Sequence, residues 1–183
     1  MHNVGYDTYC KLLARAISEA RGEPVKHEIE TTVDVPLTAH IPDGYIPSRE
    51  QKVQAYRRVA DIATEEDARQ VLLELSDRYG KAPQQVEDLV RISLVRALAN
   101  RIGASSVIVR GDLTRVRFDA GAQPDMDALM AAMRQYGAGA QMTRGAVPGL
   151  ALRGTGDVRR MLDAVLAFLR TAGGDCAGTA DTV

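Results

Sequence analysis

Hydrophobic residues recur every three to four positions along most of the chain, and this spacing predicts six helices. The segments with this period are residues 6–21, 48–62, 64–79, 83–102, 124–136 and 157–169. Two of these helices start with capping-box spacing, in which Ser48 is followed by Gln51 and Thr64 by Asp67. Gly80 then gives the helix that starts at Thr64 a typical glycine stop.

Each predicted helix carries an apolar stripe that we expect to face the core. On the helix that begins at Ser48 the stripe is Val53, Tyr56, Val59 and Ile62. On the next helix the expected buried residues are Val71, Leu72, Leu75 and Tyr79. A later helix has methionines at helical spacing, which we interpret as core residues: Met126, Met130 and Met133.

Shorter segments have the pattern of β-strands. Residues 27–37 alternate, with one face formed by Ile29, Thr31, Val33 and Val35. The stretch "SVIVRGDLTRVRF" (106–118) is split by Gly111 and Asp112, which is typical of a hairpin. Two more strands are expected at "AQMTR" (140–144) and "LALR" (150–153). Between the first strand and the second helix, "PLTAHIPDGYIP" (36–47) is rich in proline and predicts a stiff loop.

The order of these elements predicts an α+β fold. A helical N-terminal lobe with one extended strand is followed by a small ββαββα lobe. We expect a single domain over residues 1–172, with sub-lobes at about 5–103 and 104–171. Residues 173–183 are small, polar and rich in glycine, which predicts a disordered tail.

Composition and charge narrow the class of protein. The 183 residues have a formal net charge of −1, so the chain lacks the strongly basic field of a non-specific DNA-binding protein. No apolar run approaches the roughly 18 residues of a membrane span, and no signal peptide is visible. Cys10 and Cys176 lie far apart and match no metal or redox spacing. We therefore expect a cytoplasmic, disulfide-free protein with no membrane partner.

The sequence lacks recognisable catalytic motifs. There is no phosphate-binding glycine loop with lysine, no nucleophile elbow and no HExxH metal motif. His2, His27 and His40 have no ligand or triad partner at motif spacing. The acidic residues 65–67 occupy the first turn of a helix, where negative charge favours the helix dipole. We expect no enzyme activity, metal or cofactor in this chain.

The stretch "LLELSDRYGKAP" (72–83) has more charge at a helix end than packing requires. Glu74 and Arg78 are four residues apart with the acid first, the favourable order for an ion pair. At 100° per residue, Arg78 falls at the border of the apolar stripe and Glu74 just outside it, while Asp77 points further away. A solvated surface salt bridge and the rim of a protein-binding surface both fit this pattern.

This stretch resembles a signature of a known family. "ELSDRYGKAP" (74–83) resembles ELxDRFGxxP in the C-terminal domain of the bacterial transcription-repair coupling factors, the Mfd family. Three more segments match in the same order: "VGYDTYCKLL" (4–13), "DGYIP" (43–47) and "KVQAYRRVA" (52–60). The helix that ends in "RIG" before "ASSVIVRGD" also fits, so the resemblance covers Val4 to about Gly103. The second lobe matches only in the order of its elements.

The resemblance implies a regulatory role that composition alone does not. The parent of such a domain is an ATP-driven translocase on double-stranded DNA that pushes RNA polymerase off lesions and recruits UvrA. The C-terminal domain packs against the N-terminal UvrA-binding module, masks it, and restrains the motor until polymerase is engaged. ATP and Mg²⁺ belong to the parent's motor. Carried onto this sequence, Glu74 and Arg78 are expected to contact the UvrA-binding module, with Asp77 as a further candidate.

A second hypothesis is a nucleic-acid-binding accessory domain of a repair protein. Arg115 and Arg117 alternate on a predicted strand, and Arg159 and Arg160 lie near the start of the last helix. These four arginines would form the binding surface. Against this hypothesis, basic residues are scattered among acidic ones and only 4% of residues are aromatic, which leaves few side chains for base stacking.

Overall fold

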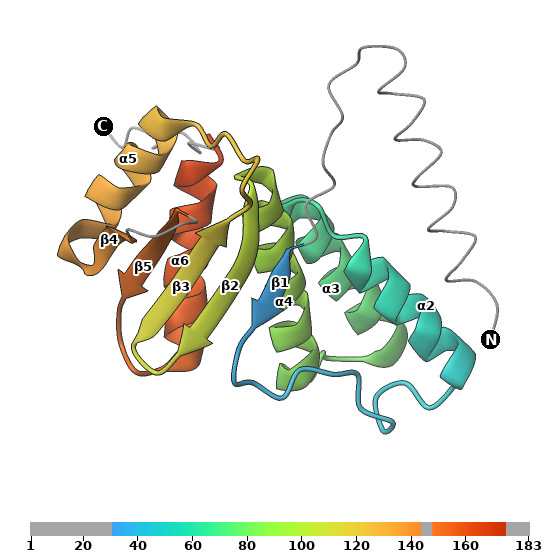
Figure 1. Cartoon of the computed structure of the whole chain (residues 1–183). Helices are drawn as coiled ribbons and strands as arrows, with labels where there is room; N and C mark the ends of the chain where they lie inside the picture. Colours follow the sequence, from blue (N-terminus) through green and yellow to red (C-terminus); the bar gives the residue numbers. More distant parts are fainter. Residues whose placement is uncertain (1–30, 144–147, 175–183) are drawn as a thin grey trace, which may run out of the picture.

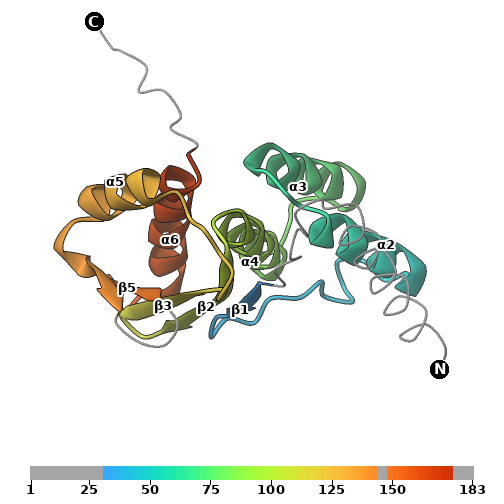
Figure 2. The same cartoon turned by 45° about the horizontal axis from the view of Figure 1, so that its top comes forward.

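The computed structural model describes residues 31–143 and 148–174 (Figure 1). The expected helix at 6–21, the segment "VGYDTYCKLL" and the start of the predicted strand, residues 27–30, lie outside the described residues. The same holds for the expected tail beyond residue 174 and for the end of "AQMTR". Within the described part, a bundle of helices and a β-sheet share one long central helix (Figure 2).

The first part of the described chain follows the predicted order of elements. They are β1 (Thr32–Asp34), α2 (Arg49–Ala60), α3 (Glu65–Tyr79) and α4 (Gln84–Arg101). The capping box of α3 is present, since the Thr64 hydroxyl accepts the Asp67 amide (3.1 Å) and Asp67 Oδ2 accepts the Thr64 amide (2.9 Å). The helix ends at Gly80, whose φ of 82° favours glycine.

The second part confirms the predicted ββαββα order and the α+β class. Its elements are β2 (Ala104–Arg110), β3 (Leu113–Phe118), α5 (Met126–Tyr136), the short 3-10 helix η1 (Gly137–Gly139), β4 (Ala140–Thr143), β5 (Gly149–Arg153) and α6 (Val158–Ala172). The predicted hairpin joins β2 and β3, and Gly111 adopts a φ of 58° in its turn.

All five strands belong to one sheet, in the order β1-β2-β3-β5-β4. β1 pairs with β2 in parallel, with Val33 opposite Val107, and the other pairs are antiparallel. The Thr31 hydroxyl reinforces the parallel pair by donating to the carbonyl of Ala104, 73 residues away, at 2.7 Å. The sheet therefore joins a strand that precedes α2 to the ββαββα part of the chain.

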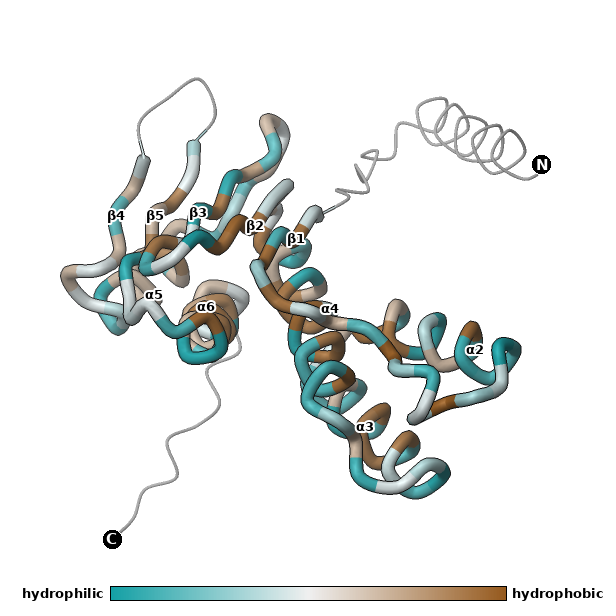
Figure 3. The backbone as a smooth tube through the Cα atoms, turned by 90° about the horizontal axis from the view of Figure 1, so that it is seen from below, coloured by the Kyte–Doolittle hydropathy of each residue, from teal (hydrophilic) through white to brown (hydrophobic). Residues whose placement is uncertain are grey.

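The sheet has one face covered by helices and one open face. α4, α5 and α6 lie on the same side of the sheet (Figure 2). Side chains that point to this side are buried, as for Val107, Val116 and Leu150, which are at most 1% exposed. The alternate residues on β3, Arg115 and Arg117, are exposed on the opposite side. This alternation of hydrophobic and hydrophilic positions is visible along the strands in Figure 3.

A continuous hydrophobic core runs through the described residues, with α4 at its centre. α4 packs against β2 and α6 on one side and against α2 and α3 on the other. Val90, Val95, Leu98 and Ala99 of this helix are at most 3% exposed. Because α4 is covered on several sides, its buried residues are not confined to the single stripe that we expected.

The apolar stripe expected on α2 is only partly correct. Val59 and the following Ile62 are buried, but Val53 is 44% and Tyr56 is 38% exposed. The buried side of α2 is instead formed by Ala55 and Val59. Tyr56 lies over the preceding loop, where its hydroxyl accepts the backbone amide of Ile41 at 2.9 Å.

The methionines of α5 are also more exposed than expected. Met126 is 50% and Met130 is 43% exposed, whereas Met133 is partly buried against the core. The residues of α5 that enter the core are Leu129 and Ala132, each 1% exposed. The buried stripe of α5 is therefore centred on Leu129 and Ala132, with Met133 at its edge. The spacing of the methionines did not predict this position.

Candidate functional site

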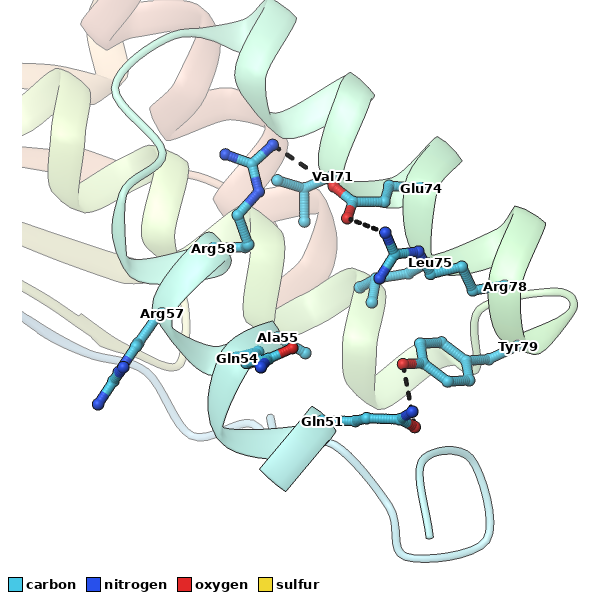
Figure 4. A pocket seen from close by; sticks show the side chains of 10 residues that line it. All are labelled: Gln51, Gln54, Ala55, Arg57, Arg58, Val71, Glu74, Leu75, Arg78 and Tyr79. Carbon is cyan, nitrogen blue, oxygen red and sulfur yellow. Dashed lines mark hydrogen bonds and ion pairs between the residues drawn. The ribbon is translucent and has the colours of Figure 1, made fainter. Parts of the chain in front are cut away.

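A groove with a volume of about 370 Å³ lies between α2 and α3 (Figure 4). Its floor is apolar and is formed by Ala55, Val71 and Leu75, each at most 7% exposed. The other side chains that line it are polar or charged: Gln51, Gln54, Arg57, Arg58, Glu74, Arg78 and Tyr79. An apolar centre with a polar rim is the usual composition of a surface that binds another protein.

Glu74 connects the two walls of this groove. Its Oε2 lies 3.4 Å from Nη2 of Arg58 on α2, and its Oε1 lies 3.5 Å from Nη2 of Arg78 on α3. Arg57 points away from these side chains (Figure 4). The side chains of Arg58 and Arg78 are 56% and 61% exposed, so a partner can reach both. One carboxylate shared by two guanidinium groups leaves a net positive charge, which favours a partner that brings an acidic group.

The C-terminal end of α3 is fixed by a neighbouring tyrosine pair. The Tyr45 hydroxyl lies 3.0 Å from the carbonyl oxygens of Leu75 and Gly80 and can donate to either. Its ring packs edge-on against Tyr79, with centroids 5.8 Å apart, and the Tyr79 hydroxyl donates to Gln51 Oε1 at 3.4 Å. Burial, and to a smaller extent the neighbouring Tyr79, raises the pKa of the Tyr45 hydroxyl. The segments "DGYIP" and "ELSDRYGKAP" therefore form one packed unit.

The structure brings two of the three predicted site residues into the groove. Glu74 and Arg78 line it and form the predicted ion pair. Asp77 is exposed and does not belong to the lining of the groove. Arg58 and Gln51 were not among the predicted site residues. They belong to α2, and only the packing of α2 against α3 places them beside Glu74, so no local pattern could have identified them.

The four arginines of the nucleic-acid hypothesis do not lie on one surface. Arg115 and Arg117 project from the open face of the sheet. Arg159 is on the side covered by helices, where it pairs with Asp88 on α4 at 2.8 Å. Arg160 lines a cavity between α5 and α6. A single surface built from all four arginines is therefore not present.

The side chains of the groove are suited to binding. Glu74 is held between two arginines, and the remaining polar lining consists of amides, an arginine and a tyrosine hydroxyl. Among residues 31–143 and 148–174 there is no cluster of three or more His, Cys, Asp or Glu side chains that could hold a metal ion. Nor does this part of the chain contain a helix long and apolar enough to cross a membrane.

The family model and the curated relatives that match this chain all concern transcription-repair coupling factors. The model of the TRCF domain family matches residues 35–129. The transcription-repair-coupling factor of Bacillus subtilis (strain 168) is 33% identical over 138 residues, which cover 74% of this chain and 12% of the relative. That of Myxococcus xanthus is 36% identical over 93 residues, which cover 51% of this chain and 8% of the relative. The chain thus spans about a tenth of the length of these relatives.

A solved structure of the C-terminal domain of a transcription-repair coupling factor has a similar fold. It superposes with a TM-score of 0.73 and covers 81% of this chain and 95% of that chain. The sequence identity over this match is 18%, so this similarity establishes the architecture and not the chemistry of the groove.

Proposed function

This chain belongs to the TRCF domain family, and we propose that it is a non-catalytic regulatory domain that masks the UvrA-binding module of its parent coupling factor. In this role it restrains the ATP-driven motor of the parent until stalled RNA polymerase is engaged. Its direct partner is the N-terminal UvrA-binding module of the same protein. UvrA, RNA polymerase and DNA are reached through the parent, in the cytoplasm.

The groove between α2 and α3 is the observation that supports this proposal. The segment "ELSDRYGKAP" (74–83) contains Leu75, which is 6% exposed and therefore has a role in core packing. It also contains Glu74 and Arg78, whose side chains are 37% and 61% exposed, so core packing does not explain them. Charges at the rim of an apolar groove provide orientation and specificity in protein recognition. We therefore assign this groove, with Arg58 on its opposite wall, as the surface that covers the UvrA-binding module.

The free energy that such a mask requires is small. Keeping the covered surface open about 1% of the time requires about 2.7 kcal/mol, or RT ln 100. Contacts between domains of one chain typically bury about 600–1,500 Å², which can provide this free energy. A mask that must be released cannot be much more stable, so the loss of one or two rim charges can shift the equilibrium.

Charge reversal in the full-length coupling factor tests the assignment. We expect R78E to raise the affinity for UvrA by up to about 100-fold, the factor that corresponds to a mask open 1% of the time, and to raise the basal ATPase rate. R69E is the matched control, since Arg69 is also on α3 and pairs with Glu66 at 2.7 Å but does not line the groove. Unchanged UvrA affinity in a folded R78E protein would falsify the assigned interface.

A direct binding assay tests whether both walls of the groove contact the partner. The chain is titrated against the isolated N-terminal UvrA-binding module of the parent. We expect R58E to weaken this complex about as much as R78E does, because Arg58 faces the same groove from α2 and shares Glu74. An R58E protein that binds as well as the unmodified chain would restrict the interface to α3.

A further inference from the structure

We propose that the open face of the sheet binds the phosphate backbone of duplex DNA. This face is distinct from the groove between α2 and α3. Arg115 and Arg117 stand two residues apart on β3, and both are exposed on this face. Neither arginine forms an ion pair within the described part of the chain, so both guanidinium groups are available to an anion.

The sheet register places hydrogen-bond donors beside Arg117. The row of residues that crosses the sheet at this position is Thr32, Ser106, Arg117, Gly149 and Thr143. The row contains three hydroxyl groups and no carboxylate. Gly149 has no side chain, so no side chain of this row separates Arg117 from Thr143. Arginine and hydroxyl side chains are frequent donors to phosphate oxygens.

The neighbouring row leaves the charge of Arg115 unneutralised. Beside Arg115 lie Ile108 and Ala151, which are apolar, and the row ends at Asp34 and Gln141. Asp34 is the only acidic residue in these two rows, and it is engaged by Arg110, whose Nη1 lies 3.1 Å from Asp34 Oδ1.

The next row carries a second neutral pair, in which Arg153 lies 3.7 Å from Asp112 of the hairpin turn. Asp34 is paired to Arg110 and Asp112 to Arg153, so among residues 31–143 and 148–174 no carboxylate compensates Arg115 and Arg117. The described part of this face is therefore cationic, although the whole chain has a net charge of −1.

The side chains of the face favour a duplex over other anionic partners. None of the described strand residues that point outward is aromatic, so the bases of a single strand would have no side chain to stack on. The cavities between α2 and α3 and between α5 and α6 lie on the helical side of the sheet. An apolar side chain of a protein partner that docked on the open face could not enter either of them. A cationic surface with hydroxyl donors beside its arginines matches the phosphates of a duplex. The choice of DNA over RNA rests on the proposed function in a DNA repair factor.

Fluorescence anisotropy of a labelled DNA duplex of about 30 base pairs tests the proposal. The full chain is titrated at salt concentrations between about 25 and 150 mM. We expect R115A/R117A to weaken binding at low salt at least about 10-fold. The slope of log K against log salt should become less steep by about 1.8, because each phosphate contact contributes about 0.9 to its magnitude. R115K/R117K retains the charges and should retain most of the binding.

A matched double variant controls for charge alone. R134A/R160A removes two exposed arginines from α5 and α6, on the helical side, and should change the affinity less than about twofold. Equal weakening by both double variants, or no duplex binding by the unmodified chain at the lowest salt, would overturn the proposal. Tighter binding of poly-glutamate or of duplex RNA would assign the face to another partner. R78E should leave duplex binding unchanged, so this test and the masking test can fail independently.

Discussion

Arg159 on α6 holds Asp88 on α4 in a two-pronged ion pair, with Nε 3.1 Å from Oδ1 and Nη2 2.8 Å from Oδ2. Asp88 is 1% exposed, and Gln84 donates a further hydrogen bond to its Oδ1 at 3.1 Å. The pair fastens the last helix of the ββαββα part to the central helix of the molecule.

Removal of Arg159 is expected to destabilise the fold substantially. R159A leaves the buried Asp88 carboxylate with the amide of Gln84 as its one remaining side-chain hydrogen-bond donor among the described residues. We expect a loss of about 2–3 kcal/mol in the free energy of unfolding. This is below the range for a fully buried pair because the Arg159 side chain is 48% exposed and water can replace part of it. Urea denaturation measures the loss. A loss below about 0.5 kcal/mol would show that solvent satisfies Asp88 without its partner.

The contribution of this ion pair should depend on pH. Burial, the largest single influence, raises the pKa of Asp88, but the hydrogen bonds from Arg159 and Gln84 and the nearby positive charges lower it below its usual 3.8. A lowered pKa gives stability that is present above the unfolded value and is lost as pH falls through the folded value. We therefore expect the difference between the unmodified chain and R159A to be full at pH 7 and to shrink below about pH 4. A difference that stays constant down to pH 3 would contradict the role assigned to the Asp88 carboxylate.

The capping box of α3 should contribute more than the cap of α2. T64A removes the acceptor for the Asp67 amide at 3.1 Å, and we expect a loss of about 1 kcal/mol. Ser48 accepts the Gln51 amide at the longer distance of 3.4 Å and so S48A should cost less. Thermal or urea unfolding of the two variants compares them directly. The reverse order would mean that the distance from the hydroxyl oxygen to the amide does not set the strength of these two caps.

Gly80 should be intolerant of a side chain although there is room for one. Its φ of 82° and ψ of −174° lie in a region that only glycine adopts readily, and we expect G80A to cost about 1–2 kcal/mol. Gly44 is the matched control, because a Cβ there also meets no atom within 4 Å and its φ is not positive. G44A should change the free energy of unfolding by less than about 0.5 kcal/mol. Equal effects of both substitutions would show that backbone strain is not the cause.

Features that depend on neighbouring residues were predictable from the sequence. The capping box at Thr64, the glycine stop at Gly80 and the turn at Gly111 each arise from the chemistry of a few adjacent residues, and each is present. The ion pair between Glu74 and Arg78 belongs to the same class, since four residues of helix fix its geometry.

Features that depend on packing between distant segments were not predictable. Periodicity showed that α2 has an apolar side, but the direction in which α3 and α4 cover it decides that Ala55 is buried and Val53 is exposed. The same holds for Arg159, which appeared as part of a basic surface because nothing local indicates that it meets Asp88, 71 residues away.

The parallel pairing of β1 with β2 determines how the fold would respond to a mechanical force applied along β1. β1 has three residues and is the outermost of the described strands on its side of the sheet. A force along this strand acts in shear, so it loads all the hydrogen bonds between β1 and β2 at the same time. The next residues along the chain that are fully packed in the core are Ile41 and Ile46. A force applied along β1 would therefore load its pairing with β2 before it loads the groove between α2 and α3.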